Sequence, residues 1–329
     1  MSDLMYGNCT HKASVAKSFQ GGWLTMYFVC TIRRMNTRIA VVGLGEVGRC
    51  YVAALAQVPE VRLSLCDPAP QAAALALAAR LQLPIHAGPG PWLAECDWTF
   101  GCVVGDAAAA VARACLSHMQ GRAGLYADFS TAGPQDMRDA GQFAAARELA
   151  FVDVAIMGAI AQTGARTPLL AAGAAIGTWQ DLMRRLGAQV TVLPEGSPGD
   201  AVSLKLLRSA FTKGLEALTV EVMTAAERQG VRKAFYDVLA DIDQGSLPRY
   251  LETLVTTHLV HARRRRKEVS EVRAQFRASG VPSDVLPAVE AAFARTIDAL
   301  DAVPIGEPEQ SVEGALQWLS AVRAADMGP

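Results

Sequence analysis

The sequence predicts an α/β domain with a mainly parallel, doubly wound sheet, followed by an all-helical domain. Two observations lead to this expectation. Between residues 38 and 194, short apolar runs alternate with helical stretches, which is typical of βαβ units. Beyond residue 200 the helical pattern continues, but no convincing strand follows.

The apolar runs and the turn-forming residues between them place the expected elements. The first run, RIAVVG, is typical of a strand buried on both faces. We expect strands at 38–43, 61–66, 97–104, 124–127, 150–155, 168–172 and 189–194. We expect helices at 46–57, 70–82, 106–119 and 134–147, then at 201–230, 231–242, 248–279, 284–301 and 309–325. The turn-rich segment EGSPGD then separates the domains, which we expect at 36–197 and 198–329.

The N-terminal segment 1–35 is interpreted as a poorly ordered extension, with Met35 as an alternative start. Its apolar run, 23–32, is too short for a membrane span, which needs about 20 residues. A signal peptide is disfavoured because Arg33 and Arg34 stand where a small-residue cleavage site should lie. No other segment has the pattern of a membrane span.

The composition excludes several classes of protein. The chain has 31 Lys and Arg against 32 Asp and Glu, for a net charge of −1, which does not favour nucleic-acid binding. The seven cysteines are odd in number and lack a Cys-x-x-Cys pair, so we expect neither a disulfide framework nor a metal site. A cytoplasmic location follows as the expectation.

The strongest motif is GLGEVG, at 43–48. Gly43, Gly45 and Gly48 form G-x-G-x-x-G directly after a strand and at the start of a helix. This spacing suits a tight turn, a close approach to a pyrophosphate and close packing of helix on strand. The free N–H groups at the helix start favour an anion. The motif therefore predicts dinucleotide binding.

Asp67 follows the second expected strand, 24 residues beyond Gly43. A carboxylate at this position can accept hydrogen bonds from the adenosine ribose, and it would repel the 2′-phosphate of NADP. We therefore expect NAD, with NADP possible if Arg62 or Arg80 alters this balance. The alternative is an ordinary turn in which Asp67 caps the next helix.

Three further segments are candidates for the substrate pocket. Ser130 and Thr131 either cap the next helix or face a ligand at the carboxyl ends of the strands. Met157 and Gly158 either end a buried strand or line the substrate wall. Lys205 stands among apolar residues, so burial would lower its pKa and suit it to proton exchange; alternatively, it is a solvated surface charge.

These segments together resemble the β-hydroxyacid dehydrogenases, which include 3-hydroxyisobutyrate and 6-phosphogluconate dehydrogenase-like enzymes. GLGEVG resembles the cofactor loop, DFSTAGP the D-x-S-T-x-x-P segment, DVAIMGA the substrate motif, and GDAVSLKLLRS the segment with the catalytic lysine. The resemblance implies a homodimer and makes Lys205 the general acid/base. The expected cofactor contacts are Gly43, Leu44, Gly45, Glu46, Val47, Gly48, Asp67, Val104 and Thr131.

The chain departs from this family at two positions. Met157 replaces the substrate-binding serine, and Ser209 replaces an asparagine four residues after the lysine. A small hydroxyacid is therefore a doubtful substrate, and the helical half resembles a poorly characterised branch. The expected substrate contacts are Ser130, Met157, Gly158, Ser209, His261 and Lys267.

The basic run HARRRRKEV, at 261–269, leaves three interpretations open. It can be a solvated helix face, it can hold a substrate carboxylate or phosphate, or it can bind nucleic acid. We favour a small-molecule substrate, with neither nucleic acid nor membrane as a partner. Lys267 falls where relatives have a lysine near the cofactor.

The function expected from the sequence is that of an NAD(P)-dependent oxidoreductase. It would transfer hydride between nicotinamide and a hydroxy acid or a related alcohol or carbonyl compound, with Lys205 moving the proton. One alternative is an imine reductase, which resembles this family in fold but lacks the lysine. The other is an NAD(P)-binding protein that has lost catalysis.

Overall fold

A computed structural model describes residues 37–119, 124–174, 176–305 and 311–326. The expected extension 1–35 lies outside these residues. The described chain divides into two compact units, one ending at Lys205 and the other beginning at Leu206. Each unit is described by itself below. The domain bounds expected from the sequence, 36–197 and 198–329, stay a prediction.

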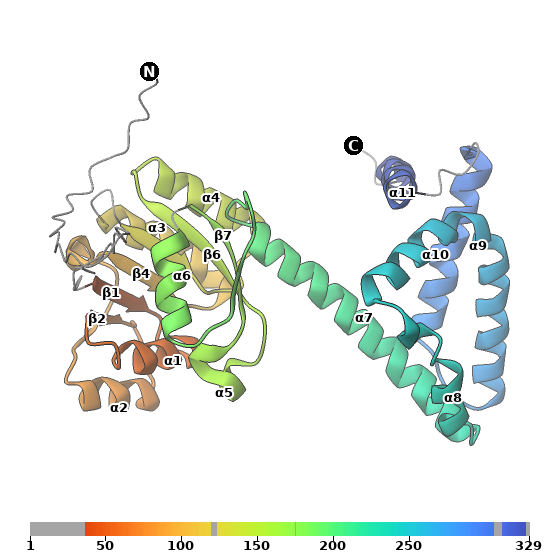
Figure 1. The fold of residues 1–329 in the computed structure, drawn as a ribbon, viewed down its shortest axis with the longest axis horizontal. Helices are drawn as coiled ribbons and strands as arrows, with labels where there is room; N and C mark the ends of the chain where they lie inside the picture. The colour runs from red at the N-terminus through yellow and green to blue at the C-terminus, as the bar shows by residue number, and fades with distance from the viewer. Residues whose placement is uncertain (1–36, 120–123, 175, 306–310, 327–329) are drawn as a thin grey trace, which may run out of the picture. The chain divides into compact units, whose positions relative to one another are not determined.

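The first unit contains one sheet of eight strands, in the order β3-β2-β1-β4-β5-β6-β7-β8 (Figure 1). All neighbouring strands are parallel except β6 and β7. The strands are β1 (Thr37–Val42), β2 (Val61–Cys66), β3 (Ile85–His86), β4 (Trp98–Gly101), β5 (Leu125–Asp128), β6 (Ala150–Ile156), β7 (Leu169–Gly173) and β8 (Val190–Val192). The mainly parallel sheet expected from the sequence is confirmed. The short strand β3 was not expected.

Helices connect the strands of this sheet. They are α1 (Glu46–Leu55), α2 (Ala72–Leu81), α3 (Gly105–His118), α4 (Pro134–Ala145), α5 (Ile160–Thr163) and α6 (Ile176–Arg185), with short 3-10 helices η1 (Pro91–Glu95) and η2 (Gly164–Arg166). Residues on β1 alternate between the faces of the sheet, as the pleat requires. Ile39 and Val41 share one buried cluster with residues of α1, α2 and α6. Ala40 and Val42 share another with residues of α3 and α4, so the sheet is covered on both faces.

The second unit is helical, as expected. α7 (Asp200–Arg228) begins in the first unit and continues into the second. The other helices are α8 (Arg232–Val238), α9 (Leu247–Ala278), α10 (Val285–Ala302) and α11 (Val312–Asp326), with the 3-10 helix η3 (Ile242–Gln244). α9 packs against α10 and α11. A small core of Ala225, Phe276, Val281 and Leu286 holds the end of α7 against α9 and the start of α10.

No helix among the described residues combines the length and apolar character that crossing a membrane requires.

Candidate functional site

The glycine loop between β1 and α1 has the geometry that its sequence predicts. Gly43 has φ of +90°, a conformation that side chains disfavour, and a Cβ there would lie 2.6 Å from the Cys102 carbonyl oxygen. A Cβ on Gly48 would lie 1.8 Å from the Gly43 carbonyl oxygen. Around Gly45, by contrast, the space is open to at least 4 Å. The loop is therefore closed against the sheet and open on the side where a phosphate would lie.

The start of α1 is suited to an anion. Gly45 is the N-cap residue and supplies no side-chain hydrogen bond to the first turn. Glu46 is exposed and Val47 is half-buried at this helix start. Arg49 Nη1 donates to the Leu44 carbonyl oxygen at 2.9 Å, which holds the loop in place. The N–H groups of this turn are thus available to a pyrophosphate.

Asp67 lies directly beside this loop. Its Oδ2 accepts a hydrogen bond from the Leu44 N–H at 2.8 Å, and its Oδ1 accepts one from the Ala69 N–H at 2.9 Å. The Asp67 N–H in turn donates to the His86 carbonyl oxygen of β3 at 3.0 Å. Because each carboxylate oxygen can accept a second bond, Asp67 keeps the capacity to bind ribose hydroxyls.

The loops after β4 and β5 meet at the same edge of the sheet. Val104 is 73% exposed and is the N-cap residue of α3. A Cβ on the next residue, Gly105, would lie 2.9 Å from the Thr131 carbonyl oxygen and 3.2 Å from Thr131 Oγ1. The structure thus brings together two loops that sequence alone assigned to the cofactor.

Ser130 lies in a buried turn after β5. The Ser130 N–H donates to Asp128 Oδ1 at 2.8 Å, and Ser130 Oγ accepts from the Ala132 N–H at 3.2 Å. The N-cap of α4 is Gly133, so neither Ser130 nor Thr131 caps that helix. Burial raises the pKa of Asp128 to about 6 against opposing hydrogen bonds from Ser130, and Asp153 adds to the rise.

Met157 and Gly158 follow β6 at this edge. The Met157 N–H donates to the Pro168 carbonyl oxygen at 2.9 Å, just before β7 begins. The Met157 side chain packs against a small apolar cluster that includes Leu170. A Cβ on Gly158 would lie 3.2 Å from Thr167 Cγ2. The expected substrate wall is therefore apolar at Met157.

Lys205 lies near the start of α7 and is half-buried, although Leu204, Leu206 and Leu207 beside it are 44%, 50% and 67% exposed. Burial lowers the pKa of its amine, and the nearby carboxylate of Asp153 opposes this effect. Asp153 itself is fully buried on β6. A partly desolvated amine with an adjacent carboxylate can hold or release a proton.

Three expected contacts lie in the second unit. Ser209 is half-buried on α7, His261 is half-buried on α9, and Lys267 is exposed on α9. Three of the four arginines between the last two have partners within the helical unit. Arg263 pairs with Asp301, Arg264 with Glu268 at 2.5 Å, and Arg265 with Thr257 Oγ1 at 2.8 Å.

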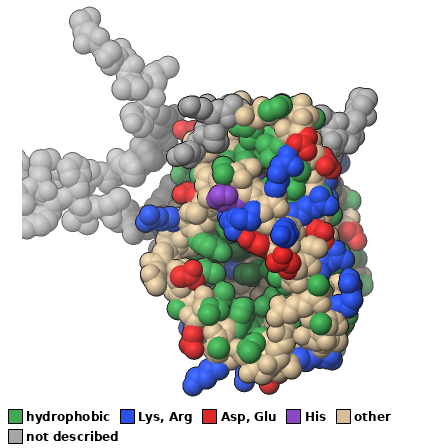
Figure 2. Space-filling model, turned by 90° about the vertical axis from the view of Figure 1, so that its right-hand side faces the viewer, with side chains coloured by type: hydrophobic (Ala, Val, Ile, Leu, Met, Phe, Trp, Pro, Cys, Tyr) green, Lys and Arg blue, Asp and Glu red, His purple; other side chains and the backbone are tan. Residues whose placement is uncertain are grey.

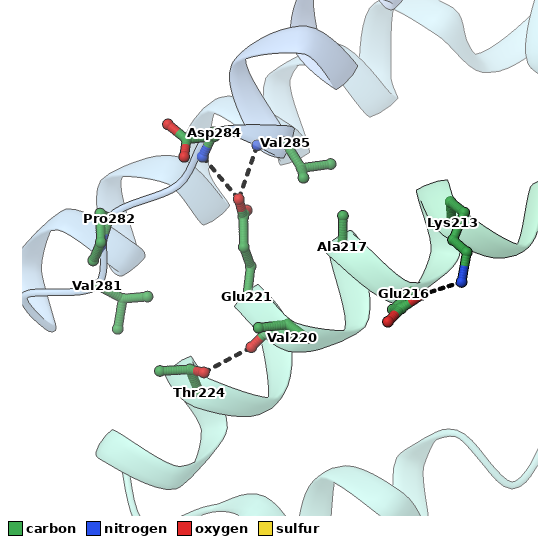
Figure 3. A pocket seen from close by; sticks show the side chains of 10 residues that line it. All are labelled: Lys213, Glu216, Ala217, Val220, Glu221, Thr224, Val281, Pro282, Asp284 and Val285. Carbon is green, nitrogen blue, oxygen red and sulfur yellow. Dashed lines mark hydrogen bonds and ion pairs between the residues drawn. The ribbon is translucent and has the colours of Figure 1, made fainter. Parts of the chain in front are cut away.

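A separate cavity of about 610 Å³ lies in the helical unit (Figure 3). One of its charged lining residues is Glu221, whose carboxylate accepts hydrogen bonds from the N–H groups of Asp284 and Val285 at 2.8 and 2.9 Å. Ser283 Oγ donates to the same carboxylate at 2.6 Å. These bonds lower the pKa of Glu221 and cap the start of α10, so Glu221 has a structural role here.

Sequence reasoning missed two buried carboxylates, Asp128 and Asp153. They stand opposite each other in the register of β5 and β6, with Asp128 at the carboxyl end of β5 and Asp153 in the middle of β6. The available signal was their charge, because each is an acidic residue in an otherwise apolar strand. Among the described residues, no group of His, Cys, Asp or Glu is arranged to hold a metal ion.

The glycine loop, the uncapped helix start and the carboxylate after β2 define a dinucleotide-binding dehydrogenase-like domain. Comparison with known families agrees. Residues 38–194 match the NAD binding domain of 6-phosphogluconate dehydrogenase, and residues 226–296 match a domain of unknown function (DUF1932). The chain thus combines a 6-phosphogluconate-dehydrogenase-like NAD-binding domain with this second domain, which confirms the resemblance and the cofactor class expected from the sequence.

The chain is also similar to individual proteins of unknown function. It is 24% identical over 238 residues to an uncharacterized 28.5 kDa protein of Methanothermus fervidus, covering 71% of this chain and 89% of the relative. It is 25% identical to a conserved protein of unknown function whose structure resembles 3-hydroxyacid dehydrogenases, with a TM-score of 0.56 and coverage of 79% and 97%.

Imine reductases share the fold. The imine reductase of Myxococcus stipitatus, solved with NAD+, is 16% identical, with a TM-score of 0.66 and coverage of 87% of this chain and 100% of that chain. At this identity the likeness concerns the fold alone.

Proposed function

We propose that the protein is an NAD(P)-dependent oxidoreductase that interconverts a hydroxyl and a carbonyl group, with Lys205 as the general acid/base. The observation that carries the proposal is the half-buried amine of Lys205, the pKa of which is lowered by burial. The glycine loop on the same unit supports cofactor binding, because Gly45 leaves room for a pyrophosphate beside free N–H groups.

A bound nicotinamide supplies or accepts the hydride, and the chain's own residues bind and move the proton. In oxidation, neutral Lys205 takes the proton from the substrate hydroxyl. In reduction, its ammonium donates a proton to the developing alkoxide. The lowered pKa of Lys205 favours this exchange, since proton transfer is most efficient when the pKa lies near the working pH.

Asp67 and the loops after β4 and β5 would hold the cofactor. Asp67 would bind the ribose while its bond to the Leu44 N–H keeps the glycine loop in place. We propose NAD as the preferred cofactor, because a fixed carboxylate at this position repels a 2′-phosphate. The substrate would lie against Met157, with Ser130, Gly158, Ser209, His261 and Lys267 as its other proposed contacts.

The test of the general acid/base is Lys205→Met, which keeps the length of the side chain and removes the amine. Turnover with the substrate found in a panel of hydroxy acids, sugar acids and their carbonyl forms should fall at least about 10²-fold. NAD binding, measured by calorimetry, should remain within twofold. Lys213→Met is the matched control, because Lys213 lies on the same helix with its side chain 77% exposed. Unchanged turnover in Lys205→Met would refute the assignment.

Reduction of an imine is the second candidate. It is favoured by Met157, which packs against an apolar cluster and offers no polar side-chain group to a hydroxy acid. A protonated imine already carries its proton, so hydride addition would not need Lys205. Turnover of cyclic imines that persists in Lys205→Met would establish this candidate, and its loss in that variant would reject it.

The partner we propose is a second copy of the chain. Leu207, Phe211 and Leu215 form a stripe on α7 at helical spacing, yet they are 67%, 41% and 50% exposed. Figure 2 shows a face on which hydrophobic side chains lie among charged ones. A homodimer would cover such a stripe. Leu207→Glu with Phe211→Glu should then halve the mass measured by light scattering, and an unchanged mass would exclude this stripe as the interface.

The five described cysteines are free thiols, which supports the cytoplasm as the proposed location. A reporter fused to the C-terminus of the full chain and observed in cells tests this, and secretion of the reporter would contradict it.

A further inference from the structure

Asp153 occupies an unusual position for a carboxylate. It lies in the middle of β6, between Val152 and Val154, and all three residues are 0% exposed. Burying a carboxylate is costly unless its oxygens are hydrogen-bonded or its charge is compensated. The partners of its two oxygens therefore show what this residue does.

One oxygen of Asp153 fixes the start of α7. Oδ2 accepts hydrogen bonds from the Gly199 N–H at 2.9 Å and the Val202 N–H at 3.1 Å. These bonds tie the first turn of the helix to the sheet and satisfy N–H groups that have no partner within the helix. This is a structural role, but it uses only one of the two oxygens.

The other oxygen, Oδ1, is buried and has no hydrogen-bond partner among the described atoms. Burial raises the pKa of Asp153, and Asp200 adds to the rise, while the N–H groups at the start of α7 oppose it. A positive charge close to Oδ1 would compensate the carboxylate.

Lys205 carries a positive charge on the helix that Asp153 caps. It follows Val202 by about one helical turn, and helical side chains lean toward the N-terminus of their helix. This direction leads from Lys205 toward the turn that Asp153 caps. Asp153 is also the charged group that acts on the Lys205 amine and raises its pKa against burial.

We propose that Asp153 is a positioning residue for Lys205: its Oδ2 fixes the start of the helix that carries Lys205, and its buried negative charge acts on the ammonium. The inference extends the proposed function, because a positioned amine can deliver a proton along a fixed direction. It also stands apart from that function, because it requires neither cofactor nor substrate.

Other charged groups around the pair are few. Asp128 faces Asp153 from β5, and Asp200 lies in the first turn of α7. Arg138 of α4 lies beside Gly199, where its Nη1 would be 3.1 Å from an added Cβ. Asp200 accepts a hydrogen bond from the Ser197 N–H at 2.8 Å.

The test is the pH dependence of acetylation of Lys205 by acetic anhydride in the full chain, followed by peptide mass spectrometry. Only the neutral amine reacts, so the midpoint of the acetylation rate against pH reports the protonation state of Lys205 directly. Asp153→Asn keeps an oxygen for the helix cap and removes the charge. In this variant the acetylation midpoint of Lys205 should lie about 1 pH unit lower than in the parent. This is the low end of the effect of a close opposite charge.

Two controls accompany this measurement. Lys213, which is exposed on the same helix, is the internal reference and should react identically in every variant. Asp200→Asn removes a carboxylate from the same helix start and should leave the Lys205 midpoint unchanged. If Asp153 only caps the helix, Asp153→Asn will leave the midpoint unchanged as well, and the proposal is overturned.

A second measurement applies if Asp153→Asn does not fold. Lys205→Met leaves the Asp153 carboxylate without its counter-charge, so its melting temperature at pH 8 should fall by about 3 °C or more. Lys213→Met should change it by less than about 1 °C, as expected for an exposed side chain. Equal melting temperatures in the two variants would overturn the proposal.

Neither measurement depends on turnover. If Lys205→Met keeps its activity while Asp153→Asn shifts the acetylation midpoint, the pairing holds and the proposed acid/base role fails. If turnover is lost in Lys205→Met but Asp153→Asn leaves the midpoint in place, the acid/base role holds and the positioning role fails.

Discussion

The two units of the chain bury their side chains to different extents. In the first unit, clusters on both faces of the sheet include residues with no exposed surface, such as Tyr51 and Trp179 on one face and Tyr126 on the other. In the second unit, large apolar side chains such as Val238 and Val260 are 70% and 58% exposed. Close packing fixes the loops that bear the candidate site, whereas the helical unit leaves large apolar side chains exposed.

The largest effect is expected where the first unit is most tightly packed. Gly48→Ala places a Cβ within 1.8 Å of a backbone oxygen, so the loop must move. The free energy of unfolding should fall by about 2–4 kcal/mol, and NAD binding should be lost. Urea denaturation and calorimetry measure the two effects.

Gly45→Ala is the matched variant, because the space around Gly45 is open. Its stability should stay within about 0.5 kcal/mol of the parent, while a methyl group in the path of the pyrophosphate weakens NAD binding at least about tenfold. Unchanged NAD binding would show that the cofactor does not approach this loop.

The next effect concerns Asp128. Its pKa is raised by burial to about 6, so the unfolded state loses its proton before the folded state does. This group therefore contributes stability at pH below about 4, and that contribution is lost as the pH rises toward 6. Asp128→Asn cannot titrate, so it does not show this loss of stability. The free energy of unfolding of the variant, relative to that of the parent, should therefore rise by about 2 kcal/mol between pH 4 and pH 7. If the difference in the free energy of unfolding between variant and parent stayed constant across this pH range, the effect of burial on Asp128 would be contradicted.

Asp67→Asn tests cofactor choice with a smaller expected change. The amide keeps an acceptor for the Leu44 N–H but loses the negative charge. NAD should bind about tenfold more weakly, and the preference for NAD over NADP should narrow. Binding constants for both cofactors measure this, and an unchanged ratio would refute the ribose role.

The smallest effect is expected on the surface of the second unit. Lys213 Nζ and Glu216 Oε2 lie 3.1 Å apart, with side chains 77% and 64% exposed. Breaking this pair with Glu216→Gln should change the free energy of unfolding by less than about 0.5 kcal/mol, since water screens exposed pairs. A loss above 1 kcal/mol would show that this face is covered in solution.

The sequence could predict the cofactor loop because its geometry is local. Gly43 and Gly48 lie in the loop and helix start that follow β1, and Asp67 directly follows β2. The order of residue types along the chain is therefore enough to indicate how these three residues are placed. The strand β3 could not be predicted, since its two residues, Ile85 and His86, are too few to show a period. The antiparallel pairing of β6 with β7 also has no local signal.

The buried carboxylates show a different limit. Asp153 and the N–H groups of Gly199 and Val202 are far apart in the chain, so no spacing reveals their hydrogen bonds. Lys205 was found through its apolar surroundings and family resemblance, but its relation to Asp153 required coordinates. Local turns were therefore predictable, and contacts between distant segments were not.

The antiparallel pairing of β6 with β7 has a consequence for how the protein could diversify. The chain leaves the sheet after Ile156 and returns at Leu169 on the same edge, with α5 and η2 forming an excursion that rests on α1. Gly164 lies close to Cys50 of that helix. Insertions in this connection would lengthen a loop without altering any strand. Evolution could therefore change what the protein recognises while leaving the glycine loop intact.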